Sequence, residues 1–196
     1  GIVGKGYSGG DDNATNNTVK DCTNSGKVAI TTKNMKVYLG GICGGGPNIT
    51  NCTNNGEVTY WITKVETSAI GGIAGNLAGN LNGNYSFGKV SIRTQSTKTR
   101  VGGLVGRCNV ANLTFDNCTV NANIGTVEGS VTTSNVGMIC GLVNQAVNSG
   151  TIYVYGTRTW VGTGTELTAD NYMDYIDGSN NGKLSALTVV FENKKQ

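Results

Sequence analysis

Apolar residues occur along the chain in short stretches that are separated by turns rich in Gly and Asn. Within several stretches apolar and polar residues alternate, as in residues 28–32 (Val-Ala-Ile-Thr-Thr) and 90–94 (Val-Ser-Ile-Arg-Thr). Such stretches are too short for helices, and their β-branched residues favour extended backbone. The pattern therefore predicts many short β-strands that are joined by tight turns.

Two sequence motifs recur along the chain and alternate with each other. The first, Gly-Gly followed by Ile or Leu and then x-Gly, lies in residues 39–44, 70–75, 101–106 and 136–141, with a truncated copy at 1–4. The second, typified by Asn-Cys-Thr-Asn-Asn-Gly-Glu-Val, lies in residues 21–28, 51–58 and 84–90, with weaker copies at 117–124 and 147–152. Copies of the first motif start 31, 31 and 35 residues apart. Two interleaved motifs with one shared period indicate a repeat architecture.

A repeat of this length, with about three short strands in each unit, fits one coil of a parallel β-helix. In that fold each coil hydrogen-bonds to the next at a spacing of ~4.8 Å, and equivalent side chains stack into columns. We therefore predict an all-β, right-handed parallel β-helix (a solenoid) of about five coils over residues 1–160. The handedness follows from the general rule for crossover connections.

Aligned copies predict which side chains stack inside the solenoid. The inward columns are expected to be Val28, Val58, Val90, Ile124 and Ile152; Ile30, Tyr60, Ile92, Thr126 and Val154; Cys22, Cys52, Tyr85 and Cys118; and Val3, Cys43, Ala74, Val105 and Cys140. A column that exchanges Cys with Ala and Val is a buried, small apolar position. This exchange favours reduced, packed thiols over disulfides, although stacked neighbours such as Cys22 and Cys52 would lie within disulfide reach.

The repeat pattern fades after Trp160. Residues 168–176 predict a short helix with Thr168 as its N-cap, and residues 184–191 predict a final strand. Since repeat arrays need a terminal unit that covers the last exposed strand edges, residues 161–196 are expected to form a C-terminal helix-plus-strand cap.

Charge and composition exclude several functions. The chain has 15 Lys and Arg against 12 Asp and Glu, and its cations are scattered rather than gathered into the basic face that nucleic-acid binders use. It contains no His, which removes His-based catalysis and His metal ligands. No apolar run approaches the ~20 residues that span a bilayer. The sequence lacks a signal peptide and begins within a truncated repeat, so we expect it to be part of a longer protein.

The two motifs together resemble the GLUG motif repeats of bacterial surface proteins, in both their content and their order. The resemblance covers about residues 1–160, and this chain departs from the pattern at Met138 and at Tyr85 and Val147, where the second motif lacks Cys. It implies a secreted or cell-surface location and a role in adhesion. It supplies no catalytic residues, since the signature positions are structural glycines and apolar side chains.

One outward column combines side chains that could grip a ligand. Trp61, Arg93 and Tyr155 are predicted to share it, with Tyr153 beside the last. Aromatic faces and a guanidinium are a common means of holding sugar rings or peptides through stacking and bidentate hydrogen bonds. The alternative is structural, because exposed aromatic residues also occur on ordinary sheets.

Two further candidate sites are weaker. The loop 177–182 places oxygen side chains of Asp177, Ser179 and Asn181 at the first, third and fifth positions of a calcium loop, but its twelfth position is Thr188 rather than Glu. An ordinary Gly/Asn turn explains the same residues. Carboxylates are scarce between residues 30 and 165, where the chain has only Glu57, Glu66, Asp116 and Glu128, and none is paired with another in adjacent coils.

These observations predict a non-catalytic, adhesin-like module that binds an extracellular glycan or a surface protein and needs no cofactor. The alternatives from other classes are a carbohydrate-active enzyme of β-helix fold, which paired carboxylates would favour, and a purely structural spacer, which a featureless polar surface would favour.

Overall fold

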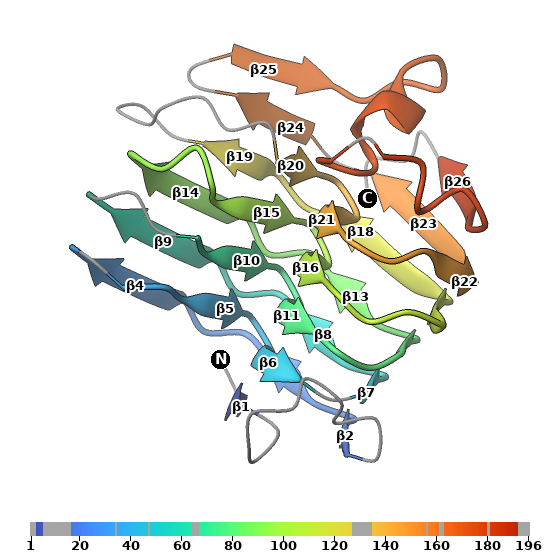
Figure 1. Ribbon diagram of the computed structural model, residues 1–196, viewed down its shortest axis with the longest axis horizontal. Helices are drawn as coiled ribbons and strands as arrows, with labels where there is room; N and C mark the ends of the chain where they lie inside the picture. The colour runs from blue at the N-terminus through green and yellow to red at the C-terminus, as the bar shows by residue number, and fades with distance from the viewer. Residues whose placement is uncertain are drawn as a thin grey trace.

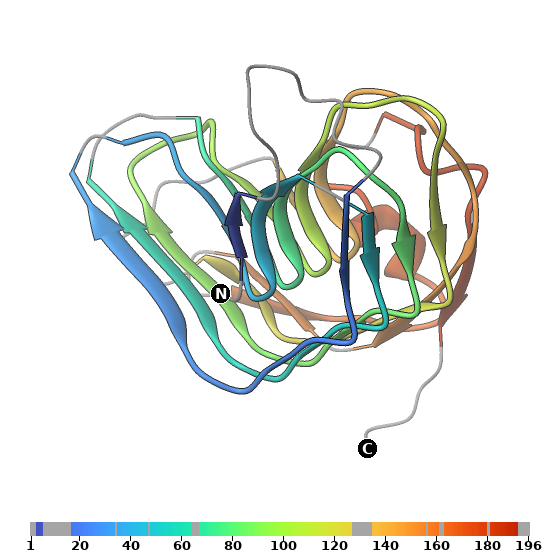
Figure 2. The ribbon, with the colours of Figure 1, turned by 90° about the horizontal axis from the view of Figure 1, so that it is seen from below.

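The computed structural model describes residues 3–5, 17–33, 35–46, 48–63, 67–126, 135–155, 157–160, 163–179 and 181–191. These residues form a parallel β-helix whose strands stack into five sheets, here named A to E (Figure 1). Viewed from its N-terminal end, the chain runs clockwise as it recedes, so the helix is right-handed, as predicted (Figure 2).

Each full turn contributes one strand to each sheet. Sheet B contains β2 (Thr18–Lys20), β7 (Asn48–Thr50), β12 (Leu81–Asn82), β17 (Leu113–Asp116) and β22 (Val147–Ser149). Sheet C contains β3 (Thr23–Asn24), β8 (Thr53–Asn54), β13 (Tyr85–Ser86), β18 (Cys118–Asn121), β23 (Thr151–Tyr155) and β26 (Thr188–Phe191). Sheet D contains β4 (Val28–Thr32), β9 (Val58–Ile62), β14 (Val90–Thr94), β19 (Ile124–Thr126), β24 (Thr157–Trp160) and β25 (Thr163–Glu166).

The remaining two sheets hold the strands on either side of the Gly-Gly motif. Sheet E contains β5 (Tyr38–Gly40), β10 (Ala69–Gly71), β15 (Arg100–Gly102) and β20 (Val136–Gly137). Sheet A contains β1 (Val3–Lys5), β6 (Cys43–Gly46), β11 (Ala74–Leu77), β16 (Val105–Cys108) and β21 (Cys140–Val143). The solenoid thus has about four full turns rather than the expected five, because residues 3–5 add a single strand and the cap follows β24 directly.

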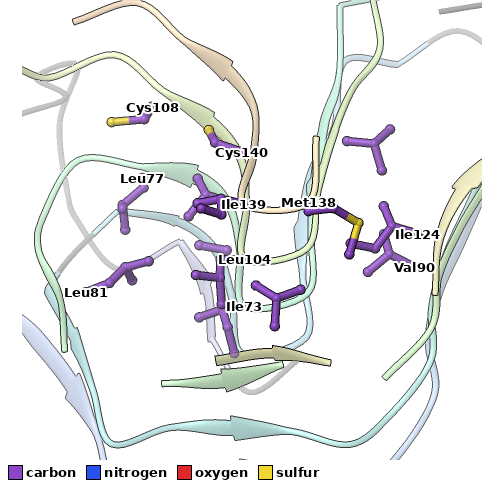
Figure 3. Packing of buried hydrophobic residues seen from close by; sticks show 14 of the residues in the cluster. Ile73, Leu77, Leu81, Val90, Leu104, Cys108, Ile124, Met138, Ile139 and Cys140 are labelled. Carbon is purple, nitrogen blue, oxygen red and sulfur yellow. The ribbon is translucent and has the colours of Figure 1, made fainter. Parts of the chain in front are cut away.

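Most of the predicted columns are confirmed by the strand register. Val28, Val58, Val90 and Ile124 are consecutive partners in sheet D, and Val3, Cys43, Ala74, Val105 and Cys140 are consecutive partners in sheet A. Figure 3 shows how such columns fill the interior, where Ile73, Leu104 and Ile139 stack above one another. All six cysteines are free, and five of them are buried, as expected for a position that exchanges Cys with Ala and Val.

The predicted place of Tyr85 in the cysteine column is wrong. Counted back from the inward valine, Gly83 and Asn84 take the places of Asn51 and Cys52, so Asn84 rather than Tyr85 lies between Cys52 and Cys118. The Cys52 N–H donates to Asn84 Oδ1 at 3.0 Å, and Asn84 Nδ2 donates to the Ile49 carbonyl oxygen at 2.7 Å. These bonds satisfy a buried amide, and Tyr85 points outward instead.

The corner between sheets B and C explains the Asp, Asn and Gly of the second motif. Asp21, Asn51 and Asn117 adopt positive φ angles of 55°, 52° and 49°, and Gly83 adopts 61° at the equivalent position of the third turn. This left-handed conformation is open to Gly and tolerated by Asn and Asp, so those residue types recur at the corner.

The Gly-Gly motif forms a seam in which backbone packs against backbone. At this motif the chain folds back into the interior, and sheet A lies against sheet E (Figure 2). A Cβ atom on Gly75 would lie 2.3 Å from the Leu39 nitrogen, and one on Gly106 would lie 2.2 Å from the Ile70 nitrogen. The close approach of these two backbone segments therefore requires glycine at both positions.

The C-terminal cap differs from the predicted helix. Residues 169–171 form a turn, and only Tyr172–Tyr175 form a 3-10 helix, preceded by Asn171 rather than by Thr168 as N-cap. The residues that follow the 3-10 helix lie on the fourth turn, where the Met138 and Ile139 N–H groups donate to the carbonyl oxygens of Tyr175 and Ile176 at 2.7 and 2.9 Å. The antiparallel pair β24–β25 and the parallel pair β23–β26 complete the cap, so the predicted final strand is confirmed at Thr188–Phe191.

The cap also contains a segment that packs on the fourth turn in the same way as the Gly-Gly motifs pack on one another. Asp177 forms a parallel bridge with Cys140, and a Cβ on Gly178 would lie 2.5 Å from the Val136 nitrogen, as one on Gly106 would from Ile70. Ile-Asp-Gly at 176–178 therefore takes the place of Ile-Cys-Gly at 139–141 one turn later. Within the described residues no helix is long and apolar enough to cross a bilayer.

We predict that Gly106→Ala lowers the free energy of unfolding by roughly 2–4 kcal/mol, because the new methyl group would overlap backbone atoms that cannot move aside. Gly26→Ala is the matched control, since its Cβ would have Asn24 Oδ1 at 3.8 Å as its nearest neighbour. Urea unfolding monitored by circular dichroism measures both. Equal stability of the two variants would contradict the close contact at the seam.

Candidate functional site

The predicted pair of Trp61 and Arg93 lies on the outer face of sheet D. The two residues are direct partners on adjacent strands β9 and β14, and the Arg93 guanidinium carbon lies 6.0 Å from the centroid of the Trp61 ring. The Trp61 side chain is 44% exposed, and Arg93 is exposed as well. This geometry permits a cation–π interaction and leaves ring surface and guanidinium donors available to a ligand.

Buried neighbours hold this pair in place. Tyr60 and Ile62 on one strand and Ile92 and Thr94 on the other point inward and are almost completely buried. The Tyr60 hydroxyl lies 2.8 Å from Ser68 Oγ, which anchors β9 to the segment that leads into sheet E. The alternation of the strand thus presents Trp61 and Arg93 outward from a rigid base.

Tyr153 and Tyr155 do not share this column, so that part of the predicted site is wrong. They lie on β23, which pairs with β18 in sheet C: Tyr153 is the partner of Thr119, and Tyr155 is the partner of Asn121. For the same reason Ile152 and Val154 stack on Cys118 and Val120 rather than in sheet D. The place expected for the fifth turn in sheet D belongs to β24, where Arg158 is the partner of Ile124.

Sequence reasoning missed the aromatic pair Tyr85 and Phe87 on the outer face of sheet C. Their ring centroids lie 6.0 Å apart with an interplanar angle of 15°, and the side chains are 37% and 41% exposed. Tyr85 lies in the same row as Thr119 and Tyr153 on the following turns. The signal that could have found the pair is the constant spacing to the inward valine: Tyr85 and Phe87 precede Val90 by five and three residues, as Thr53 and Asn55 precede Val58.

A row of charges follows the corner between sheets C and D. Lys27 Nζ lies 3.1 Å from Glu57 Oε2 on the next turn, and Lys89 follows on the turn after that. The hydrogen bond from Lys27 is the main reason that the pKa of the Glu57 carboxyl falls below its ordinary value. Glu57 is therefore held as a carboxylate that is already paired. Asp116 lies elsewhere, in sheet B, where its Oδ1 accepts a hydrogen bond from the Thr151 N–H at 3.1 Å.

The calcium-loop residues form a turn within the cap. The Asp177 Oδ1 atom accepts hydrogen bonds from the N–H and the hydroxyl of Ser179 at 2.9 and 2.6 Å. Asn181 Nδ2 donates to the Val143 carbonyl oxygen at 2.6 Å, so its amide joins the loop to β21. Asp177 is 8% exposed, and position 180 lies outside the described residues. The loop oxygens are thus turned toward the protein, which favours the alternative of an ordinary turn over a cation site.

Buried thiols are poor nucleophiles in this fold. Burial raises the pKa of the Cys108 thiol and of the Cys118 thiol to about 11, and raises that of Cys140 well above its ordinary value. Figure 3 shows Cys108 and Cys140 within the apolar interior. No cluster of three or more Cys, Asp or Glu side chains able to hold a metal ion occurs among the described residues, which do not include Glu66 and Glu128.

Comparisons of the chain with known protein families, with curated proteins and with solved structures give no match.

The raised thiol pKa values predict a loss of stability at alkaline pH. Below pH 9 the thiols of Cys108 and Cys118 are protonated in both the folded and the unfolded chain, and above it the unfolded chain ionises first. Each thiol therefore removes about 2 kcal/mol from the free energy of unfolding between pH 9 and pH 11. Urea unfolding of the double variant Cys108→Ala/Cys118→Ala should show a shallower decline than the wild type over this range. Parallel curves would exclude the proposed cause.

We expect calcium chloride to produce no heat beyond dilution in isothermal titration calorimetry of the protein, because Asp177 and Asn181 are engaged by the cap itself. A saturable heat that disappears in the Asp177→Asn variant would instead show that the loop binds calcium.

Proposed function

We propose that this protein is a non-catalytic, adhesin-like module that binds a glycan or a protein partner outside a bacterial cell, either at the cell surface or in the secreted state. The resemblance of its two motifs to GLUG motif repeats supports this setting. The stiff, repetitive scaffold supports a role in display, because side chains on its sheets are held at fixed spacings.

The observation that carries the proposal is the Trp61–Arg93 pair. Large apolar side chains that remain exposed on a well-packed protein often mark contact surfaces. Here an exposed indole lies beside a guanidinium on two hydrogen-bonded strands, so a ligand meets a preformed surface. Trp and Arg are also among the residues that contribute most to binding energy at protein contacts.

We expect Trp61→Ala and Arg93→Ala each to weaken binding about tenfold, because the pair supplies both the stacking surface and the charged donors. Fluorescently labelled protein applied to a glycan array and to cultured animal cells provides the measurement. Thr31→Ala is the matched control, since Thr31 is the partner of Trp61 on the preceding turn and is exposed.

Circular dichroism should show that all three variants fold. If the array and the cells bind the Trp61 and Arg93 variants as strongly as the wild type, this surface does not mediate binding.

A further inference from the structure

A second candidate site lies at the corner between sheets C and D, one turn away from the Lys27–Glu57 ion pair. Phe87, Lys89, Asn121 and Asn123 line a hollow of about 460 Å³. Pairing of Ser86 with Val120 places Phe87 beside Asn121, and pairing of Val90 with Ile124 places Lys89 beside Asn123. The four side chains thus come from two adjacent turns whose relative position is fixed by backbone hydrogen bonds.

One wall of this hollow is an aromatic side chain that remains exposed although the fold does not require it there. Phe87 is 41% exposed, has no polar atom that needs water, and stacks on Tyr85. Positions equivalent to Phe87 hold Ser25, Asn55 and Asn121, so the corner itself does not require an aromatic residue. An exposed aromatic ring beside polar groups is suited to stacking against the apolar face of a sugar.

The polar walls complement the hydroxyl groups of a sugar. Asn121 and Asn123 each carry an amide that can donate and accept hydrogen bonds. Among the described residues, no side-chain hydrogen bond engages the Asn121 amide. Both residues lie on the turn that follows the turn of Phe87 and Lys89.

The charge of the hollow points to an anionic ligand. Glu57 lies beside Lys89 on the neighbouring turn, but its carboxylate is already bonded to Lys27 at 3.1 Å. Lys89 is exposed and forms no ion pair with any residue in the described part of the chain. The charge of Lys89 also helps to lower the pKa of the neighbouring Glu57 carboxyl, but its ammonium donors remain available for a carboxylate or a sulfate at the edge of the hollow.

We propose that this hollow binds an acidic saccharide. The sugar ring stacks on Phe87, its hydroxyl groups bond to the Asn121 amide, and its anionic group pairs with Lys89. This inference deepens the proposed binding function and rests on it, and it names a ligand class and a site separate from Trp61.

A polymer fits the surrounding surface better than a single sugar. Tyr155 is the partner of Asn121 on the next turn, and Tyr153 lies two turns from Tyr85 in one row. Two inter-strand spacings are about 10 Å, so aromatic rings recur along sheet C at an interval that a chain of sugars can follow.

The test uses the whole protein and isothermal titration calorimetry with polygalacturonate oligomers, their methyl esters, dextran sulfate and dextran. We expect saturable binding of polygalacturonate or dextran sulfate, little binding of the two neutral polymers, and weaker binding as the salt concentration rises. Phe87→Ala should weaken binding about tenfold, and Lys89→Gln about fivefold. Lys98→Gln, at an exposed lysine away from the corner, is the matched control for the lost charge.

The outcomes separate this proposal from the preceding one. Binding of polygalacturonate alone or dextran sulfate alone supports the proposal and tells a carboxylated ligand from a sulfated one. Equal binding of charged and neutral polymers, no binding of either acidic polymer, or unchanged binding by a folded Phe87→Ala variant overturns it. If Trp61→Ala abolishes acidic-polymer binding while Phe87→Ala does not, the hollow is excluded and the Trp61 site stands. If only the Phe87 variant loses binding, the reverse holds.

Discussion

Hydrogen bonding between successive turns in a fixed register is the constraint on which every other feature of this protein depends. Because each strand lies on its equivalent in the next turn, a residue can change only if its replacement accepts the same backbone conformation and the same space. The corner between sheets B and C accepts Asp21, Asn51, Gly83 and Asn117, which share a left-handed backbone. The seam between sheets A and E accepts only glycine at positions such as Gly75 and Gly106. The corner and the seam together keep the strands in register, and the register determines which side chains point inward.

The same constraint explains how much of the fold could be predicted from the sequence. Where motifs keep their spacing, as from Val28 to Ile124, the columns follow directly from the alignment of the copies. Where the motif residues change type, the alignment fails locally: Gly83 and Asn84 replace Asn51 and Cys52, and Asn84 takes the place that Tyr85 was expected to fill. Apolar alternation is the same in sheets C and D, so the pattern of residues 152–155 could not tell which sheet the strand joins.

The candidate sites also differ in how far the sequence could predict them. Trp61 and Arg93 were predictable as neighbours because their turns have the same length and each lies three residues after an inward valine. The hollow at Phe87 was not predictable, because it lies at a corner and combines side chains from two successive turns, one of which departs from the motif at Gly83 and Asn84. The cap was mistaken for a longer helix, since its residues are held by hydrogen bonds to Met138 and Ile139 that local propensity does not reveal.

Residues 176–178, which repeat the seam within the cap, determine which side chain ends the inward column of sheet A. Asp177 occupies the position in sheet A that Cys140 and Val105 fill below it, and its carboxylate is satisfied by Ser179. Asp177 is only 8% exposed, so the column of small apolar side chains ends in a carboxyl group whose Oδ1 atom accepts hydrogen bonds from within the cap. A strand that continued sheet A beyond Asp177 would therefore meet a carboxyl group instead of the small apolar side chain that each lower turn presents.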